Sequence, residues 1–265
     1  MIRFRELHRD GLFLMPNAWD IGSAKLLSSL GFLAIATTSS GHAASLGRPD
    51  QYVTRDELLV HVEALVAAVD IPINVDAERC FADDLAGVEE TVRLIADAGA
   101  AGCSIEDYDP RDGSIDPLEI AVERVAAAAD AASVHGMVLT ARAENHLYGI
   151  GDLDDTIARL RAYRDAGAAV LYAPGLVDIE HITRLVNEVE APVNVLAMRH
   201  GPSVPDLRAV GVRRVSTGGG LARAAYGALV AAARELQAAG TSTYLDAAIP
   251  GDELDAALGS VDAQP

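Results

Sequence analysis

Short apolar segments alternate with longer segments of mixed polarity along most of the chain. The short segments are rich in Val, Ile, Leu and Ala, which is typical of buried strands, and the longer ones have the length of helices. The predicted strands span residues 12–15, 33–37, 73–76, 102–106, 137–141, 170–173, 193–196 and 214–217. The predicted helices span residues 20–30, 54–69, 84–98, 117–134, 153–166, 177–190, 203–209 and 219–239.

Glycine follows four of these helices directly before an apolar segment. The four are Gly31, Gly99, Gly167 and Gly211, and 68 residues separate Gly31 from Gly99 and Gly99 from Gly167. This spacing is about the length of two strand–helix units. A glycine just past a helix adopts positive φ without steric cost, so it is the expected residue there. The repeated order of helix, glycine and strand predicts parallel strands joined by helices.

Eight strand–helix units in about 240 residues predict a (β/α)8 TIM barrel, with residues 1–265 as a single domain. No Gly-x-Gly-x-x-Gly follows any predicted strand, which disfavours an open nucleotide-binding sheet. The Gly218–Gly220 run after the last strand either binds an anion or forms a tight turn. Residues 241–265 form an extension with an extra short helix near 252–258 and a tail, 260–265, that is expected to be disordered.

Charge and cysteine content narrow the class of protein. The chain of 265 residues has 39 acidic and 21 basic residues, a net charge of −18, and no basic cluster, which disfavours nucleic acid and anionic membranes as partners. Cys80 and Cys103 have neither disulfide nor zinc-site spacing. The charged N-terminus does not resemble a signal peptide, and no apolar run approaches the length of about 18 residues that spans a membrane. We therefore expect a cytoplasmic protein.

Two carboxylates mark the end of the third predicted strand. Asp76 and Glu78 are two residues apart, so in a strand they project to the same side. Converging carboxylates repel one another, and a divalent cation held by oxygen ligands is the usual compensation. The alternative is a polar strand end that meets solvent. This motif alone is therefore compatible both with a metal site and with a solvated strand end.

Other predicted strand ends carry charged residues that would complete such a metal site. In a TIM barrel the active site lies at the carboxyl ends of the strands, which share one rim. Acidic groups there come from neighbouring segments, and an arginine follows on the next strand: Asp50, Asp76, Glu78, Glu106 and Arg142. This combination suits Mg²⁺ and a small carboxylic acid that the arginine grips. The alternative is that Arg142 only neutralises Glu106 in a buried ion pair.

The chain resembles the isocitrate lyase/phosphoenolpyruvate mutase superfamily over nearly its whole length. The resemblance rests on ordered matches at the predicted strand ends: residues 16–20, 37–41, 46–50, 75–78, 105–107, 141–142 and 192–195. It implies a TIM barrel whose last helix is exchanged between the subunits of a dimer, usually within a tetramer. This would explain the extra C-terminal helix.

The resemblance also implies a role for each matched residue. Asp76 would bind the metal directly, and Asp50, Glu78 and Glu106 would hold its waters. The substrate would be bound by Ser39, Ser40, Gly41, Asp76, Arg142 and Asn194. The shared chemistry is stabilisation of a pyruvate-like enolate while a bond to its C3 is broken or made. Glu78, Glu106 and Arg142 are then the expected catalytic residues, with the two glutamates as candidates for moving protons.

Departures from the best-known members narrow the reaction. The Lys-Lys/Arg-Cys-Gly-His loop of isocitrate and methylisocitrate lyases is replaced by the short segment 108–115, and their Pro-Glu is Pro174-Gly175 here. The asparagine that phosphonate-processing members carry in this loop is also missing. Arg79 and Cys80 stand where glycines are common. Together with Asn145 and Asn194 we expect them to line the mouth. Further candidates for acids or substrate-selecting groups, each with a packed or solvated alternative, are Cys80, His42, His146, Arg199 and His200.

These features predict a Mg²⁺-dependent lyase that cleaves a C–C bond of a small 2-oxo or 2-hydroxy acid. The reaction would be a decarboxylation or a retro-aldol or retro-Claisen step. Two alternatives stay open. One is P–C bond chemistry on a phosphonopyruvate-type substrate, and the other is a protein that binds Mg²⁺ and an oxo acid without turnover.

Overall fold

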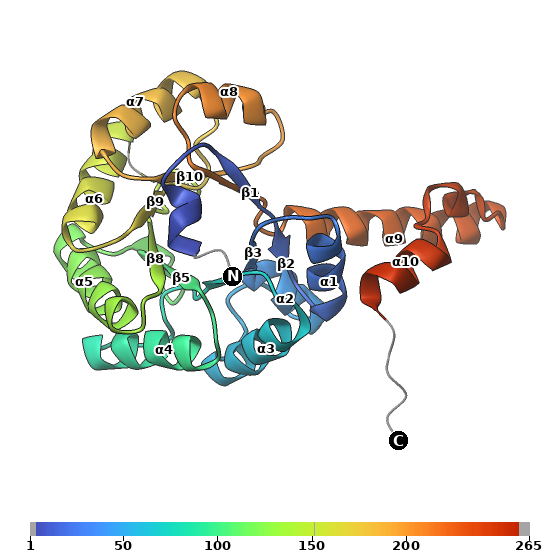
Figure 1. Cartoon of the computed structure of the whole chain (residues 1–265). Coiled ribbons are helices and arrows are strands. Elements are labelled where there is room, and N and C mark those ends of the chain that lie inside the picture. The colour runs from blue at the N-terminus through green and yellow to red at the C-terminus, as the bar shows by residue number, and fades with distance from the viewer. Residues whose placement is uncertain (1–3, 151, 260–265) are drawn as a thin grey trace.

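The computed structural model describes residues 4–150 and 152–259 and contains a parallel barrel surrounded by helices (Figure 1). The strands are β1 (Phe13–Met15), β2 (Asn17–Ala18), β3 (Ile35–Thr37), β4 (Ile73–Asp76), β5 (Gly102–Glu106), β8 (Val138–Arg142), β9 (Val170–Tyr172), β10 (Val193–Leu196) and β11 (Arg214–Ser216). The helices are α1 (Ile21–Ser29), α2 (Ser39–Ser45), α3 (Arg55–Ala68), α4 (Leu85–Asp97), α5 (Leu118–Val134), α6 (Leu153–Asp165), α7 (Ile179–Val189), α8 (Val204–Ala209), α9 (Gly220–Ala239) and α10 (Gly251–Leu258).

Nine strands make an eight-unit barrel because the first strand is split. The sheet order is β1-β11-β10-β9-β8-β5-β4-β3-β2, and every pairing is parallel. β1 pairs with β11 while β2, just beyond Pro16, pairs with β3. Proline has no N–H for the ladder, so it sits where the chain passes from one neighbour to the other. The predicted fold class is confirmed.

The predicted elements are confirmed with boundary shifts of one or two residues. The helix-ending role of glycine is confirmed too, since Gly31, Gly99, Gly167 and Gly211 have φ between +82° and +105°. The prediction missed α2, the 3₁₀ helices Phe4–His8 and Thr243–Ala247, and a small hairpin of β6 (Tyr108–Asp109) and β7 (Ser114–Ile115). Each missed element is short, and its stability comes from tertiary contacts more than from local sequence.

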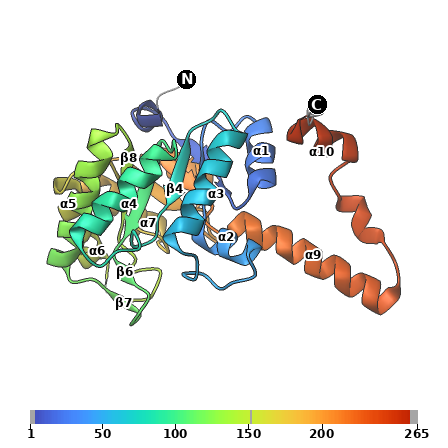
Figure 2. The same ribbon diagram turned by 90° about the horizontal axis from the view of Figure 1, so that it is seen from below.

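The N-terminal 3₁₀ helix lies across the end of the barrel opposite the β6–β7 hairpin that follows Glu106 (Figures 1 and 2). Its Phe4 packs with Phe13 and Met15. Its His8 meets the fully buried Arg214, whose Nη1 lies 3.2 Å from His8 Nε2. Burial, followed by the charge of Arg214, lowers the pKa of His8 to about 3, so His8 is neutral and can accept this hydrogen bond.

Arg214 has neutral partners inside the barrel. It donates to Asn194 Oδ1 and to Thr140 Oγ1, each at 2.9 Å. We expect Arg214→Leu to lower the free energy of unfolding by about 3 kcal/mol or more, because it leaves several buried acceptors without a donor. Chemical denaturation would measure this, with the half-buried neighbour Arg213→Leu as control. Equal effects at the two positions would contradict the argument.

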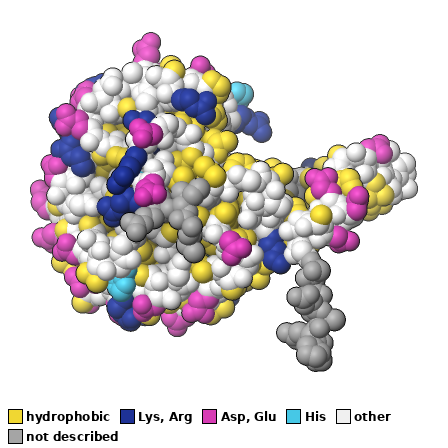
Figure 3. Space-filling view, in the orientation of Figure 1, with side chains coloured by type: hydrophobic (Ala, Val, Ile, Leu, Met, Phe, Trp, Pro, Cys, Tyr) yellow, Lys and Arg dark blue, Asp and Glu magenta, His cyan; other side chains and the backbone are white. Residues whose placement is uncertain are grey.

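Helix α9 leaves the barrel instead of packing into its wall (Figures 1 and 2). The chain then turns back, and α10 lies against α1, where Lys25 Nζ donates to Leu258 O at 2.8 Å. Hydrophobic side chains are exposed along α9, including Leu229, Val230 and Leu236, and more lie on the adjoining part of the barrel (Figure 3). The predicted C-terminal helix is confirmed, while the disorder expected for residues 260–265 lies outside the described residues.

None of the helices in the described ranges is both long enough and apolar enough to cross a lipid bilayer.

Candidate active site

Asp76 lies at the carboxyl end of β4, where three groups fix it. Its backbone N–H donates to Thr37 Oγ1 at 2.8 Å. Its Oδ2 accepts a hydrogen bond from the Ser39 N–H at 3.2 Å, and its Oδ1 accepts one from Arg142 Nη1 at 2.8 Å. The carboxylate is therefore held between the start of α2 and the end of β8, while the residue stays partly exposed to the cavity.

Arg142 is the centre of the polar cluster. β8 pairs with β5 so that Arg142 lies opposite Glu106. Its three nitrogens face three carboxylates: Nη1 faces Asp76, Nη2 lies 3.1 Å from Glu106 Oε2, and Nε lies 2.7 Å from Glu144 Oε1. The guanidinium also lies over the ring of Tyr172, 5.5 Å from its centroid. The alternative that Arg142 pairs with Glu106 is thus correct as geometry, although the pair belongs to a larger cluster.

A cavity of about 200 Å³ opens beside this cluster. Of the predicted site residues it is lined by Ser39, Ser40, Asp50, Asp76, Arg142 and Asn194. Its remaining wall includes Leu147, Pro174 and Leu196, which are apolar. Sites for drug-sized ligands are typically about 300–1,000 Å³. The size and lining of this cavity therefore suit a small acid.

Three predicted residues lie outside the lining of this cavity. Glu106 contacts it through Arg142 and also accepts a hydrogen bond from Gln51 Nε2 at 3.1 Å. Glu78 is buried and borders an adjoining cavity of about 280 Å³. Gly41 lies on the buried side of α2, where an added Cβ would stand 2.6 Å from Thr38 Cγ2 and 2.9 Å from Trp19 Cβ, so the close packing requires glycine.

Burial and mutual repulsion raise the pKa of the carboxyl groups in the cluster. For Asp50 the cause is burial, followed by the charge of Asp76. For Glu78 the same causes, with Asp50 added, raise the pKa to about 8. Burial also raises the pKa of Glu106 and Glu144 above their usual values, despite the opposing effect of Arg142. Arg142 therefore faces more acidic groups than a single guanidinium can neutralise.

This excess of carboxyl groups fits a divalent cation. The described residues contain no group of three or more His, Cys, Asp or Glu side chains arranged to hold a metal by themselves. Mg²⁺ does not need such a cage, since it keeps several waters and usually takes one or two protein carboxylates together with substrate oxygens. Asp76 and Asp50, which face the same cavity, are suitable hard oxygen donors.

The first turn of α2 forms another wall. Ser39, Ser40 and Gly41 were predicted to bind the substrate, but the N–H groups of Ser39 and Gly41 already donate to Asp76 and, at 3.4 Å, to Thr38 Oγ1. Ser40 Oγ lies against Gly219, close enough that a Cβ there would clash with it. The Gly218 N–H donates to Asn17 Oδ1 at 2.8 Å, so this glycine run forms a tight turn that packs on Ser40.

The predicted mouth residues need correction. Asn194 lines the cavity, but Cys80 is fully buried and its burial raises the thiol pKa to about 12, which makes it a poor acid. Asn145 is buried and donates to Thr156 Oγ1 at 2.7 Å. Arg79 turns away from the cavity and binds Asp116. These errors arose because sequence adjacency to a strand end does not fix the direction of a side chain.

The other candidate acids are either packed in the protein interior or absent from the lining of the main cavity. His42 is buried and stacks on His61, with ring centroids 3.7 Å apart. His146, Arg199 and His200 are not among the residues that line the main cavity. None of these side chains therefore has the geometry of an acid in this cavity.

Two residues of the cluster were not assigned from the sequence. Glu144 follows Arg142 by two positions, so the spacing argument used for Asp76 and Glu78 could have identified it. Gln51 adopts φ +66°, which is uncommon outside glycine, and places its amide on Glu106. No pattern in the sequence predicts that backbone conformation.

Comparisons with known proteins find matches over most of the chain. The model of the phosphoenolpyruvate phosphomutase family matches residues 4–237. Oxaloacetate decarboxylase 2 of Pseudomonas fluorescens (strain Pf0-1) is 31% identical over 222 residues, which cover 80% of this chain and 75% of that protein.

Two solved structures extend the comparison. A Burkholderia cenocepacia J2315 protein described as a lyase/mutase is 50% identical, with a TM-score of 0.93 over 98% of this chain and 95% of its own. Phosphonopyruvate hydrolase, solved with oxalate and Mg²⁺, is 25% identical, with a TM-score of 0.83 over 95% of this chain and 92% of its own.

Proposed function

Because this chain belongs to the isocitrate lyase/phosphoenolpyruvate mutase superfamily, whose members include carbon–carbon lyases and mutases, we propose that it is a Mg²⁺-dependent lyase. It would cleave a C–C bond of a small 2-oxo or 2-hydroxy acid through a pyruvate-type enolate. The observation that carries the proposal is the arrangement of Asp76 and Arg142 at one small cavity. The decarboxylase relative and the neighbour with oxalate and Mg²⁺ support it.

The metal would be held directly by Asp76, with Asp50, Glu78 and Glu106 holding its water ligands. When bound, Mg²⁺ supplies a Lewis acid for the oxygen atoms of the substrate. The same carboxylate also accepts a hydrogen bond at Asp76 Oδ1 from Arg142 Nη1, at 2.8 Å. A guanidinium has five N–H donors, so Arg142 retains capacity for a substrate carboxylate beside its three protein partners.

The residues of the chain orient the substrate for bond cleavage. Glu144 and Tyr172 hold the Arg142 side chain in one direction, so the carboxylate that it binds is positioned relative to Asp76. With an oxaloacetate-like acid, the electrons of the breaking bond pass to C3 as CO₂ leaves, and a proton must then reach C3. Glu78 and Glu106 are candidates for relaying that proton from water to C3.

A substrate panel tests this proposal. Release of 2-oxo acid from oxaloacetate, malate and citrate analogues would be measured with Mg²⁺ and with EDTA. Turnover that requires Mg²⁺ supports the proposal. Phosphate release from phosphonopyruvate alone would instead indicate P–C chemistry. Binding of Mg²⁺ and oxalate with no product from any compound would indicate a binding protein without turnover.

We also propose that the chain assembles through α9 into a helix-exchanged dimer, within a tetramer. Support comes from α9 itself, which leaves Leu229 63% exposed and Leu236 47% exposed beside an uncovered apolar part of the barrel (Figure 3). We expect Leu229→Asp to dissociate the assembly, because it places a charge in an apolar contact. Sedimentation velocity would measure the change, and a monomeric wild type would contradict the proposal.

A further inference from the structure

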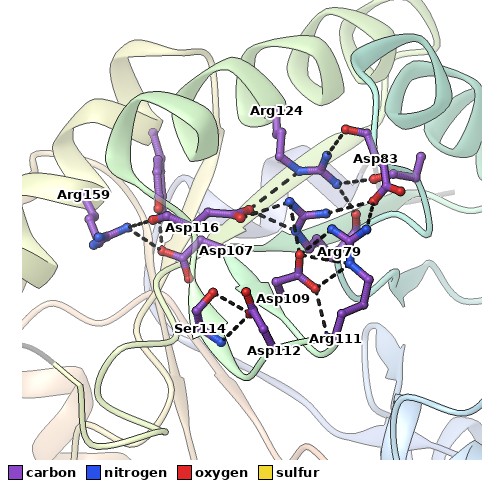
Figure 4. A network of polar contacts seen from close by, with 12 residues as sticks. Arg79, Asp83, Asp107, Asp109, Arg111, Asp112, Ser114, Asp116, Arg124 and Arg159 are labelled. Atoms are coloured by element: carbon purple, nitrogen blue, oxygen red, sulfur yellow. Dashed lines mark hydrogen bonds and ion pairs between the residues drawn. The ribbon is translucent and has the colours of Figure 1, made fainter.

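The segment after Glu106 is an ordered hairpin. β6 pairs with β7 through Tyr108 and Ile115, and the Asp116 N–H that follows donates to Asp107 O at 2.7 Å. Tyr108 also stacks on Tyr148, with ring centroids 3.8 Å apart. Figure 4 shows that a network of charged residues surrounds this hairpin.

Asp116 is the acidic centre of that network. Arg79 Nε and Nη2 each donate to one of its carboxylate oxygens at 3.0 Å, and both side chains are largely buried. The two-point contact fixes direction as well as distance. On the backbone side, Arg159 Nη1 donates to Asp116 O at 2.9 Å. Asp116 is thus held from two sides where the hairpin joins α5 (Figure 4).

The same network supports a strained turn. Glu78, Cys80 and Phe81 have φ values of +49°, +60° and +55°, which side chains other than glycine rarely adopt. Such a turn persists only where its surroundings hold it. The buried Arg124 does so, since its Nη2 donates to Arg79 O at 2.6 Å and to Ala82 O at 2.8 Å.

We propose that Arg79 is a positioning residue that ties the turn carrying Glu78 to the hairpin that follows Glu106. Arg79 belongs to the strained turn, and Asp116 belongs to the end of the hairpin. Their contact fixes the hairpin as a permanent wall of the second cavity, which Glu78 also borders, so the hairpin does not close over a substrate as a lid. This inference goes beyond the proposed lyase function, because it concerns the motion of a segment and not the reaction.

Trypsin cleavage after Arg111 reports that motion, because the Arg111 side chain at the hairpin tip is 61% exposed. In the wild-type protein we expect slow cleavage at a rate that Mg²⁺ and oxalate leave unchanged. Asp116→Asn keeps the shape and removes the charge, so we expect cleavage about tenfold faster. The variant should also show a lower kcat with little change in KM. Arg79→Gln, which leaves Asp116 intact, should behave in the same way.

The control is Asp154→Asn, the same substitution in an exposed pair with Arg184, and it should change neither cleavage nor kinetics. Slower wild-type cleavage in Mg²⁺ and oxalate would show a closing lid and overturn the inference. Unchanged cleavage and kinetics in Asp116→Asn and Arg79→Gln, with only a lower thermal midpoint, would also overturn it. Failure of the wild type to bind Mg²⁺ and oxalate would count against the proposed function, while the cleavage rates of the variants would still test the hairpin.

Discussion

Replacing Asp76 with asparagine is expected to lower kcat/KM for any Mg²⁺-dependent substrate by at least about 10³-fold, because a Lewis-acid contribution of several kcal/mol depends on this ligand. Asparagine keeps the side-chain volume and an oxygen that can accept the Ser39 N–H, so the thermal midpoint should change little. Steady-state kinetics at saturating Mg²⁺ measures the effect.

Asp165→Asn is the matched control for Asp76→Asn. Its side chain is 67% exposed and pairs with Arg164, away from the main cavity. It should retain wild-type kinetics. Full activity in Asp76→Asn would contradict the assignment of Asp76, and activity that survives EDTA would contradict the metal requirement as a whole.

Mg²⁺ affinity is expected to rise about tenfold per pH unit between pH 6 and pH 8, provided that one proton leaves for each ion bound. Glu78 is the expected source, since its pKa of about 8 keeps it protonated below that pH. Thermal shift titrations with Mg²⁺ at several pH values would measure the slope. Glu78→Gln should flatten it, and an unchanged slope in that variant would contradict the prediction.

In the absence of Mg²⁺, the raised pKa of Glu78 should make the protein less stable as pH rises. A carboxyl whose folded pKa is raised binds more protons when folded than when unfolded between about pH 4.5 and pH 8, so the free energy of unfolding decreases with rising pH in that window. The buried histidines act oppositely. The pKa of His8 is lowered to about 3 and that of His61 to about 4, so stability is lost as pH falls below about 6.5.

The barrel could be predicted because its signals are local and repeated. Eight apolar strands and the glycines at the helix ends recur along the chain, and each follows from backbone sterics or burial. The split of the first strand at Pro16 and the short helix α2 could not be predicted in the same way. Both depend on which neighbour the segment meets in the closed barrel.

The sequence predicted which residues belong to the candidate site, but it predicted their positions only in part. Strand order placed Asp76 and Arg142 on one rim, as the structure shows. The direction of Arg79 and the burial of Cys80 depend on Asp116 and Arg124, which lie 36 or more residues away in the sequence. Such partners are chosen by packing, which the pattern of a single strand end does not record.

Calorimetric titration of oxalate tests the central claim most directly, because oxalate resembles the proposed enolate and binding needs no turnover. We expect heat of binding when Mg²⁺ is present, none when EDTA replaces it, and none in Asp76→Asn under either condition. Equal binding of oxalate with and without Mg²⁺, or undiminished Mg²⁺-dependent binding in Asp76→Asn, would contradict it.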